Sequence, residues 1–326
     1  MRVFINGFGR IGRAALAIMI KDPEIEIVGI NDIYDFESMA QLLAHDSIYG
    51  AFDTPVLLEK NHLLLDTLRI PLFREKEAHK LHLKGVDILL QCTGVHLDRI
   101  TNIPYLDAGA KKILISAPAA SDIPTMVMDT HNKALPDDRI FSNSSCSANA
   151  IVPLLDALDS VFKIQAASLS MYHAYTAYQK LLDVKHYSKD IRRARSATQN
   201  IQPLMSSAAS ETEKFFPHLH QKVTAKSIRV PLSAVTLYDI TLKVQKTTSL
   251  EQIQTQLKKQ VSRYPKLLAL AHKDAVSTDF IASPFGAIID LSLTQIIGED
   301  FIKIGAWQDN EYGYATQLVR MAKSLS

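Results

Sequence analysis

A cysteine and a histidine in distinctive settings are the residues of this chain best suited to covalent chemistry. Cys146 lies in the run "SNSSCSANA", Ser142 to Ala150, among small and polar residues. A helical pattern follows it, so the sequence predicts Cys146 at a helix N-terminus, where partial positive charge lowers the pKa of a thiol. His173 lies on a predicted strand, where its imidazole can take a proton from Cys146 or from a reacting hydroxyl. Spacing alone leaves a second interpretation open, in which both are ordinary core residues.

A glycine motif opens the chain. Gly7, Gly9 and Gly12 form "GFGRIG", directly after a strand-like run and at the start of a helical one. These glycines permit a tight turn and let a pyrophosphate approach backbone N–H groups at the helix N-terminus. Asp32 ends the next predicted strand, about 20 residues on, where a carboxylate bonds a ribose 2′-hydroxyl. The pattern predicts NAD rather than NADP, because Asp32 would repel a 2′-phosphate. A tight turn without a ligand is the alternative.

The elements that must position these residues change in character along the chain. In the first half, apolar runs at 2–5, 24–32, 86–94 and 111–118 alternate with helical patterns such as 10–20 and 36–45. Continuous apolar runs are typical of strands covered on both faces. This order predicts α/β structure, with βαβ units forming a Rossmann-type, doubly wound parallel sheet.

After Cys146 the pattern indicates a second kind of domain. A helical run at 147–162 is followed by long strand patterns at 166–176, 224–230 and 233–245. Their alternation predicts an α+β catalytic domain with a mainly antiparallel sheet. A polar loop at 178–199 is too long for a plain connection, so we expect it to be functional or an interface. We place a dinucleotide-binding domain at 1–145, with the C-terminal helix 309–326 packing back on it, and the catalytic domain at 146–308.

Composition narrows the function classes. The 326 residues carry a formal net charge of +2, which does not indicate nucleic-acid binding through bulk charge. No apolar run approaches the roughly 20 residues needed to cross a bilayer, and we expect no membrane association. Two cysteines do not make a disulfide framework, so free thiols favour a reducing compartment, and we expect a cytoplasmic protein. No metal site is predicted.

Six sequence motifs follow one another in order along the whole chain. They are "INGFGRIGR", "SNSSCSAN", "HAYTAYQ", "RRAR", "IRVP" and "WQDNEYGY". Together with the shorter stretches "HDSIYGAF", "CTG" and "SAPA" between them, they resemble the glyceraldehyde-3-phosphate dehydrogenase family. The resemblance implies an NAD-dependent enzyme of glycolysis that oxidises glyceraldehyde 3-phosphate with inorganic phosphate to 1,3-bisphosphoglycerate. Cys146 would form a hemithioacetal and then a thioester, His173 would withdraw the proton, and the protein would be a homotetramer.

The resemblance also implies binding residues. Those for the dinucleotide are Gly7, Gly9, Arg10, Ile11, Gly12, Asp32, Arg74, Thr93, Gly94, Ser116 and Asn310. Those for the substrate phosphate and inorganic phosphate are Ser145, Ser147, Thr176, Ser206, Ser207 and Arg229. Three further arginines, in "RRAR", serve either phosphate binding or a solvated subunit interface: Arg192, Arg193 and Arg195.

The sequence departs from the family pattern in four respects. Ala150 replaces a second cysteine, and Gln308 replaces a tyrosine after the tryptophan. Ser206 and Ser207 replace Thr-Gly, which removes a glycine from the predicted inorganic-phosphate site. Lys185 replaces a proline in the long loop, and a lysine there would tolerate a 2′-phosphate, so NADP is not excluded.

Two other functions compete with this interpretation. Erythrose-4-phosphate dehydrogenase uses the same cysteine and histidine but releases a free acid by hydrolysis. The stretch "KFFPHL" at 214–219 favours it, whereas Thr176 in "HAYT" favours the phosphorylating enzyme. A catalytically silent binding or moonlighting protein is the alternative of another class. The intact Cys146, His173, Arg229 and Asn310 argue against a loss of chemistry.

Overall fold

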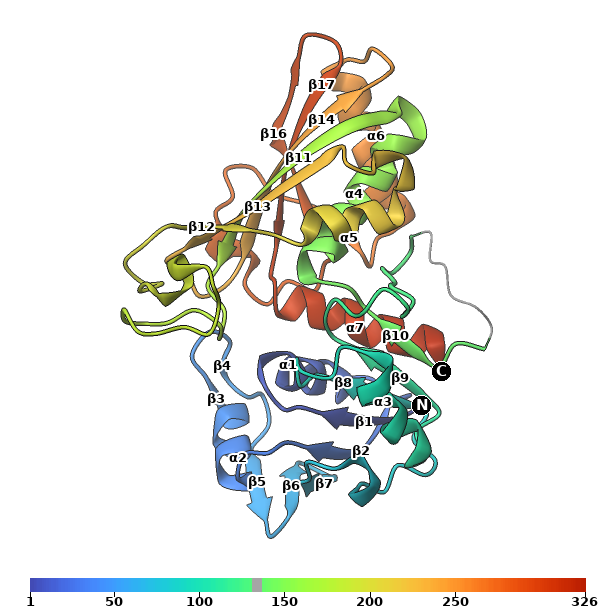
Figure 1. Ribbon diagram of the computed structural model, residues 1–326, viewed down its shortest axis with the longest axis vertical. Coiled ribbons are helices and arrows are strands. Elements are labelled where there is room, and N and C mark those ends of the chain that lie inside the picture. The colour runs from blue at the N-terminus through green and yellow to red at the C-terminus, as the bar shows by residue number, and fades with distance from the viewer. Residues whose placement is uncertain (131–136) are drawn as a thin grey trace. The chain divides into compact units, whose positions relative to one another are not determined.

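The computed structural model describes residues 1–130 and 137–326, which form two compact units (Figure 1). The first unit contains residues 1–128, the described residues up to 145, and the segment 315–326. The second contains residues 129–130 and 146–314. Each unit is built around its own sheet, and the two sheets differ in strand direction.

The first unit has an eight-stranded sheet in which six neighbouring strands are parallel. In sheet order these six are β10 (Ile140–Ser142), β9 (Lys112–Ile115), β8 (Ile88–Gln91), β1 (Arg2–Asn6), β2 (Glu26–Asn31) and β7 (Leu68–Phe73). Two antiparallel strands, β6 (His62–Leu65) and β5 (Val56–Glu59), extend one edge. Strand order reverses on either side of β1, so the predicted doubly wound, Rossmann-type sheet is confirmed.

Helices of the first unit begin where the sequence supplies caps, with one exception. Asp35 accepts the Ser38 N–H at the start of α2 (Phe36–Ala44), and Asp98 accepts the Thr101 N–H at the start of α3 (Arg99–Asp107). At the start of α1 (Arg10–Met19), Gly9 provides no side-chain cap.

The C-terminal helix α7 (Tyr312–Leu325) buries apolar side chains in the same core as β1 and α1. These are Leu318, Val319, Met321 and Ala322.

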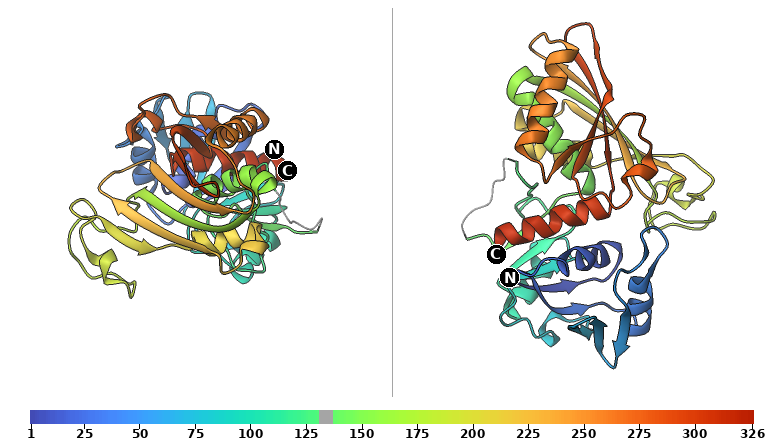
Figure 2. Two further views of the ribbon diagram at one scale, coloured as in Figure 1. Left: turned by 90° about the horizontal axis from the view of Figure 1, so that it is seen from above. Right: turned by 180° about the vertical axis from the view of Figure 1, so that it is seen from behind.

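The second unit has a seven-stranded sheet that is mainly antiparallel, as predicted. Its order is β12 (Gln202–Met205), β13 (Val223–Val230), β11 (Ile164–Ala174), β14 (Thr236–Val244), β17 (Phe301–Gln308), β16 (Ala287–Ile297) and β15 (Leu268–Leu270). Only the pairs β11–β13 and β15–β16 are parallel. Three helices cover one face of the sheet (Figure 2): α4 (Cys146–Phe162), α5 (Ala208–Phe215) and α6 (Leu250–Arg263).

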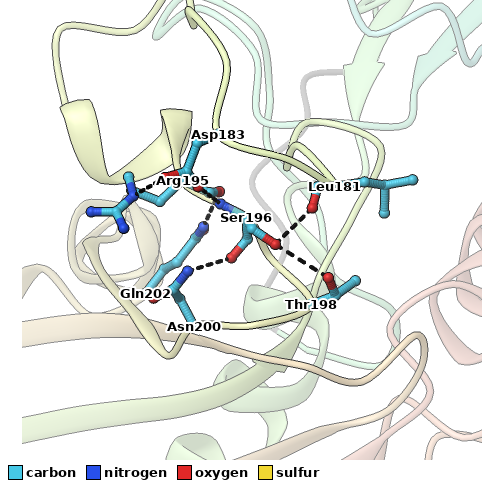
Figure 3. Close-up of polar contacts among 7 residues, drawn as sticks. All are labelled: Leu181, Asp183, Arg195, Ser196, Thr198, Asn200 and Gln202. Atoms are coloured by element: carbon cyan, nitrogen blue, oxygen red, sulfur yellow. Dashed lines mark hydrogen bonds and ion pairs between the residues drawn. The ribbon is translucent and has the colours of Figure 1, made fainter.

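The long polar loop between β11 and β12 is held by its own hydrogen bonds (Figure 3). Asp183 accepts bonds from the Arg195 Nε at 2.7 Å and from the Ser196 N–H at 2.8 Å. The Ser196 hydroxyl donates to the Leu181 carbonyl at 2.6 Å. Further along, the Gln202 amide donates to the Arg195 carbonyl at 2.7 Å. The loop is therefore braced internally although its only regular element is the short turn Ile191–Ala194.

Candidate active site

Strand register in the second unit places five polar residues in one row across the sheet. His173 on β11 pairs with Arg229 on β13 and with Thr236 on β14. Thr236 in turn pairs with Gln308 on β17, and Arg229 pairs with Gln202 on β12. Directly paired residues project to the same face of a sheet. Side chains separated by more than a hundred positions in the sequence are thereby brought together.

Cys146 meets this row from the start of α4. Its Sγ lies 3.6 Å from the Nε2 of His173, so the two residues that the sequence singled out are in contact. The turn before the helix is strained, because Ser144 has a φ of 56°. A second strained residue, Val235 with a φ of 70°, precedes Thr236 in the row. Strain therefore lies beside both the cysteine and the histidine row.

The ionisation of the pair differs from the sequence-based expectation. Burial raises the pKa of the Cys146 thiol, although the positive charge of Arg229 and hydrogen bonds from Ser147 act to lower it. The prediction that the helix N-terminus lowers this pKa overall is therefore wrong, because desolvation outweighs it. Burial, followed by the charge of Arg229, lowers the pKa of His173 to about 3. The structure thus holds a neutral imidazole beside a neutral thiol.

Arg229 is the nearest cation to this pair. Its Nη1 lies 2.6 Å from the Nδ1 of His173 and donates to the Ala174 carbonyl at 2.8 Å. No carboxylate of the described residues forms an ion pair with it, and its Nε has no partner among them. Burial, and then the charge of Arg193, lower the pKa of Arg229. Of the three loop arginines, Arg193 is therefore the one whose charge reaches this site.

The other two loop arginines are engaged elsewhere. Arg192 donates to Asp190 through Nε and Nη2, both at 2.8 Å. Arg195 pairs with Asp183, as described for the loop. These exposed pairs lie within the loop itself, so the structure does not bring Arg192 or Arg195 to the cysteine.

A tyrosine that sequence reasoning missed lies near Cys146. Tyr238 is fully buried, and its hydroxyl donates to the Oε1 of Gln308 at 2.7 Å. Burial and then the proximity of Cys146 raise its pKa well above the ordinary value, whereas a hydrogen bond from Ser147 lowers it. The phenol is thus protonated. Gln308 stands where the family pattern has a tyrosine, and here a phenol reaches the same neighbourhood from the adjacent strand.

Several buried polar atoms of this region have no partner among the described residues. They include Gln308 Nε2, Thr236 Oγ1, Arg229 Nε, Gln179 Nε2 and Asn310 Oδ1. Buried polar atoms are normally hydrogen-bonded, so the unpartnered atoms of Arg229 and Thr236, the two strand neighbours of His173, fit a polar ligand. The sequence marks Thr236 and Tyr238 only through the alternation of residues along β14. That pattern predicts that both side chains face inward, but it does not show which residues they contact.

The remaining predicted phosphate residues occupy two loop ends of the second unit. The Thr176 hydroxyl donates to Gln179 Oε1 at 2.9 Å, just beyond β11. Ser206 accepts the Ala208 N–H at 3.1 Å at the start of α5. Ser207 has a φ of −71°, an ordinary helical value. The glycine missing from this loop is therefore not needed for backbone conformation.

In the first unit, the predicted dinucleotide residues follow the carboxyl ends of the parallel strands. Gly7 follows β1, Asp32 follows β2, Arg74 follows β7, Thr93 follows β8 and Ser116 follows β9. Parallel strands share this edge, and it is where open α/β sheets bind ligands. Ten of the eleven predicted dinucleotide residues lie there in sequence stretches next to these strand ends: Gly7, Gly9, Arg10, Ile11, Gly12, Asp32, Arg74, Thr93, Gly94 and Ser116. Asn310 belongs to the second unit.

The glycines at this edge have separate structural reasons. Gly7 has a φ of 96°, and a Cβ there would lie 2.5 Å from the Thr93 nitrogen. A Cβ on Gly12 would lie 2.2 Å from the Gly7 oxygen, because helix and loop pack closely. A Cβ on Gly9 would meet nothing within 4 Å. Gly9 therefore faces open space at an uncapped helix start, which is the cradle that a pyrophosphate requires.

Charged residues around the glycines are firmly held. The Asp32 carboxylate accepts the N–H groups of Phe8 and of Ile33, which fixes it against the glycine loop. Arg74 donates through Nε to the Ile33 carbonyl at 3.1 Å. Arg10 forms an ion pair with Asp46, and its guanidinium lies 5.4 Å from the centre of the Tyr49 ring. A fixed carboxylate and an open glycine cradle fit a dinucleotide, and the unpartnered Asn310 Oδ1 fits an amide donor.

The fold and these two sites together define a class: a dinucleotide-binding α/β protein with a cysteine–histidine pair on a second, antiparallel domain. Family models give the particular family. Residues 1–99 match the glyceraldehyde 3-phosphate dehydrogenase NAD binding domain, and residues 145–310 match the glyceraldehyde 3-phosphate dehydrogenase C-terminal domain. The chain belongs to the glyceraldehyde-3-phosphate dehydrogenase family.

Full-length relatives agree with this assignment. A glyceraldehyde-3-phosphate dehydrogenase of Helicobacter pylori is 38% identical, over 100% of this chain and 99% of the relative. One of Thermotoga maritima is 37% identical, over 98% of this chain and 97% of the relative. A chloroplastic one of Arabidopsis thaliana is 36% identical, over 99% of this chain and 83% of the relative.

The described residues contain neither a membrane-spanning helix nor a cluster of metal ligands. None of their helices is both long and apolar enough to cross a membrane. No group of three or more histidine, cysteine, aspartate or glutamate side chains among them is arranged to hold a metal ion.

Proposed function

We propose that this protein catalyses the phosphorylating oxidation of glyceraldehyde 3-phosphate, with Cys146 as nucleophile and His173 as general base. The observation that carries the proposal is the 3.6 Å contact between Cys146 Sγ and His173 Nε2, inside a site that holds an unpaired arginine. Cys146 attacks the aldehyde carbon, and His173 takes the hydroxyl proton as the thioester forms. The relatives named above all carry glyceraldehyde 3-phosphate in their names, which favours this substrate over erythrose 4-phosphate.

Two anion sites serve the reaction. Arg229 holds the phosphate of the substrate together with Thr176, since a guanidinium forms charge-assisted bonds to phosphate oxygens. Ser145, Ser147 and Ser206 hold the attacking inorganic phosphate, and Arg193 supplies positive charge near Arg229. The unstrained backbone of Ser207 supports retention of this second site.

The predicted dinucleotide residues bind NAD. The chemistry that NAD supplies when bound is acceptance of a hydride from the substrate. The glycine loop receives the pyrophosphate, Asp32 accepts a bond from the ribose, and Asn310 orients the carboxamide with its unpartnered Oδ1. The domain roles follow: 1–145 with the helix 309–326 for the dinucleotide, and 146–308 for catalysis.

The decisive experiment is an assay of NADH formation with both aldehydes, each with and without phosphate. Glyceraldehyde 3-phosphate should give sustained turnover only with phosphate and a single burst per site without it. Free acid formed at full speed without phosphate, with erythrose 4-phosphate preferred, would support the hydrolytic alternative. No turnover of either aldehyde would support a silent binding protein.

Asp32 should make NAD the better cofactor by kcat/KM. The exposed Lys185 acts in the opposite direction, because its charge would favour a 2′-phosphate. The ratio of kcat/KM values for NAD and NADP tests this directly. Equal or better use of NADP would refute the expectation, and Lys185→Pro should then restore preference for NAD if the lysine is the cause.

The long loop supports a homotetramer. It is braced internally, yet it exposes 66% of Leu181, 73% of Leu182 and 78% of Tyr187. Apolar side chains displayed by a fixed loop are suited to a subunit interface. Sedimentation equilibrium of wild type and Leu182→Lys tests this: a tetramer weakened by the lysine is expected, and a wild-type monomer would contradict it.

Two free thiols favour a reducing compartment, and we place the protein in the cytoplasm.

A further inference from the structure

The Nδ1 atom of His173 touches two groups of opposite hydrogen-bonding character. The Ala174 carbonyl oxygen, at 2.7 Å, is only an acceptor. The Arg229 Nη1, at 2.6 Å, is only a donor. Nδ1 carries either a proton or a lone pair, so it can satisfy one of these neighbours at a time.

This arrangement favours a lone pair, rather than a proton, on Nδ1 of His173. Arg229 Nη1 donates to the Ala174 carbonyl as well, at 2.8 Å, so that oxygen is satisfied without the imidazole. A proton on Nδ1 would instead point toward a guanidinium N–H. The neutral ring must then carry its proton on Nε2, the atom that lies 3.6 Å from Cys146 Sγ. In that tautomer Nε2 has no lone pair with which to accept a proton, so the base is inactive.

A phosphate that enters the site can displace Arg229 from its position against the imidazole ring. Arg229 is partly buried without a carboxylate partner among the described residues, and its buried Nε is unpartnered there. A cation that is largely withdrawn from water and has no counter-ion is unfavourable. Hydrogen bonds from a guanidinium to a phosphate are about twice as strong as those between neutral groups. A phosphate entering the site therefore offers Arg229 both a counter-ion and stronger acceptors.

We propose that Arg229 is a positioning residue that locks the tautomer of His173 until the phosphate of the substrate binds. The phosphate draws the guanidinium away from Nδ1, one proton leaves Nε2 for solvent and one proton from solvent binds Nδ1, whose N–H then donates a hydrogen bond to the Ala174 carbonyl. Nε2 then presents its lone pair to Cys146, and the ring is neutral before and after the exchange. This inference rests on the proposed function for its ligand, a phosphorylated aldehyde, and adds how binding prepares the base.

Nitrogen NMR of the imidazole tests the lock without turnover. Protein labelled with ¹⁵N-histidine is compared with labelled His173→Asn, whose missing signals identify the ring of His173. The probe is glycerol 3-phosphate, which has the phosphate but no aldehyde, and glycerol is the uncharged control. Without the probe the proton should reside on Nε2, and at saturating glycerol 3-phosphate the two nitrogen shifts should exchange their pattern. Glycerol should change nothing.

Variants separate the lock from a general effect of charge. Arg229→Met should give the Nδ1–H tautomer with and without the probe. Arg263→Met, which removes an exposed arginine at the end of α6, should behave as wild type. The same tautomer in wild type with and without saturating glycerol 3-phosphate would overturn the proposal, even if Arg229→Met does not fold.

The outcomes also distinguish the lock from the proposed function. A tautomer that switches in a protein oxidising neither aldehyde would leave the lock standing and refute the function. Oxidation of glyceraldehyde 3-phosphate by a protein whose tautomer never changes would refute the lock alone. Where both hold, glyceraldehyde without a phosphate should lose kcat as well as affinity, because it leaves the base in the wrong tautomer.

Discussion

The two cysteines of the chain lie in contrasting surroundings. Cys92 follows β8 in the first unit, where burial raises its pKa to about 12 and a hydrogen bond with Ser116 is the one influence that lowers it. Burial also raises the pKa of Cys146, but there the charge of Arg229 and hydrogen bonds from Ser147 and from the cysteine's own backbone act against it. Among the described residues, only Cys146 has an imidazole nitrogen at its sulfur.

The contrast shows what makes a buried thiol chemically useful. Burial raises the pKa of both thiols, so burial alone does not separate them. The difference is a means of removing the proton on demand, which Cys146 has in His173 and Cys92 lacks. Reactivity at Cys146 should therefore depend on its neighbours, and each neighbour can be removed in turn.

The largest expected effect comes from the cysteines themselves. Cys146→Ser should lower aldehyde oxidation by more than about 10³-fold, because a serine hydroxyl is a far weaker nucleophile at neutral pH. Binding of NAD should be unchanged. Cys92→Ala is the matched control and should stay within a few fold of wild type. Steady-state NADH formation measures both, and a Cys146→Ser enzyme within tenfold of wild type would rule out covalent catalysis.

Loss of the base should have the next largest effect. His173→Asn should slow hydride transfer by roughly 10²–10⁴-fold, the usual range for a lost general base. Rapid mixing with excess NAD measures this step directly. With glycerol 3-phosphate bound, iodoacetamide should also alkylate Cys146 more slowly at neutral pH in the variant than in wild type, while alkylation of Cys92 is equally slow in both proteins. An unchanged alkylation profile would show that His173 does not influence the thiol.

The phenol near Cys146 should matter for stability. Tyr238→Phe removes the donor to Gln308 and leaves a buried acceptor without a partner, which costs about 1–3 kcal/mol. Tyr172→Phe is the control on β11, since its ring is 40% exposed, and it should stay within about 0.5 kcal/mol of wild type. Urea unfolding compares the two. Equal free energies of unfolding for both variants would remove Tyr238 from the account.

Acid should weaken the folded protein partly through His173. Its folded pKa of about 3 lies below the ordinary value of 6.5, so the unfolded chain takes up the proton first. The stability tied to its neutral form is complete above pH 6.5 and is lost as the pH falls toward 3. Between pH 7 and pH 5 this removes up to about 2 kcal/mol. His173→Asn should show a smaller decrease in urea unfolding over this range, and an identical decrease would contradict the assigned neutral state.

The first unit was largely predictable from the sequence, because its dinucleotide edge is made by local pattern. Gly7 and Gly9 lie between β1 and α1, Gly12 lies in the first turn of α1, and Asp32 directly follows the next strand. The polar row of the second unit was not predictable from spacing. Thr236 and Gln308 meet His173 only through the register of β11, β14 and β17, which no local pattern encodes.

The pKa of Cys146 was mispredicted for a related reason. A helix N-terminus is visible in the sequence, whereas the burial that outweighs it depends on the whole fold. The family motifs supplied Cys146, His173 and Arg229 as a set. They did not supply the contact between Arg229 and the imidazole, nor the place of Tyr238.

Mass spectrometry of the acylated protein shows directly whether Cys146 carries the acyl group. The protein is mixed with glyceraldehyde 3-phosphate and NAD without phosphate, quenched in acid and digested. We expect one acyl group per chain, on the peptide that contains Cys146, and its removal within one turnover when phosphate is added before the quench. An acyl group on Cys92, or no acyl group while NADH accumulates, would contradict it.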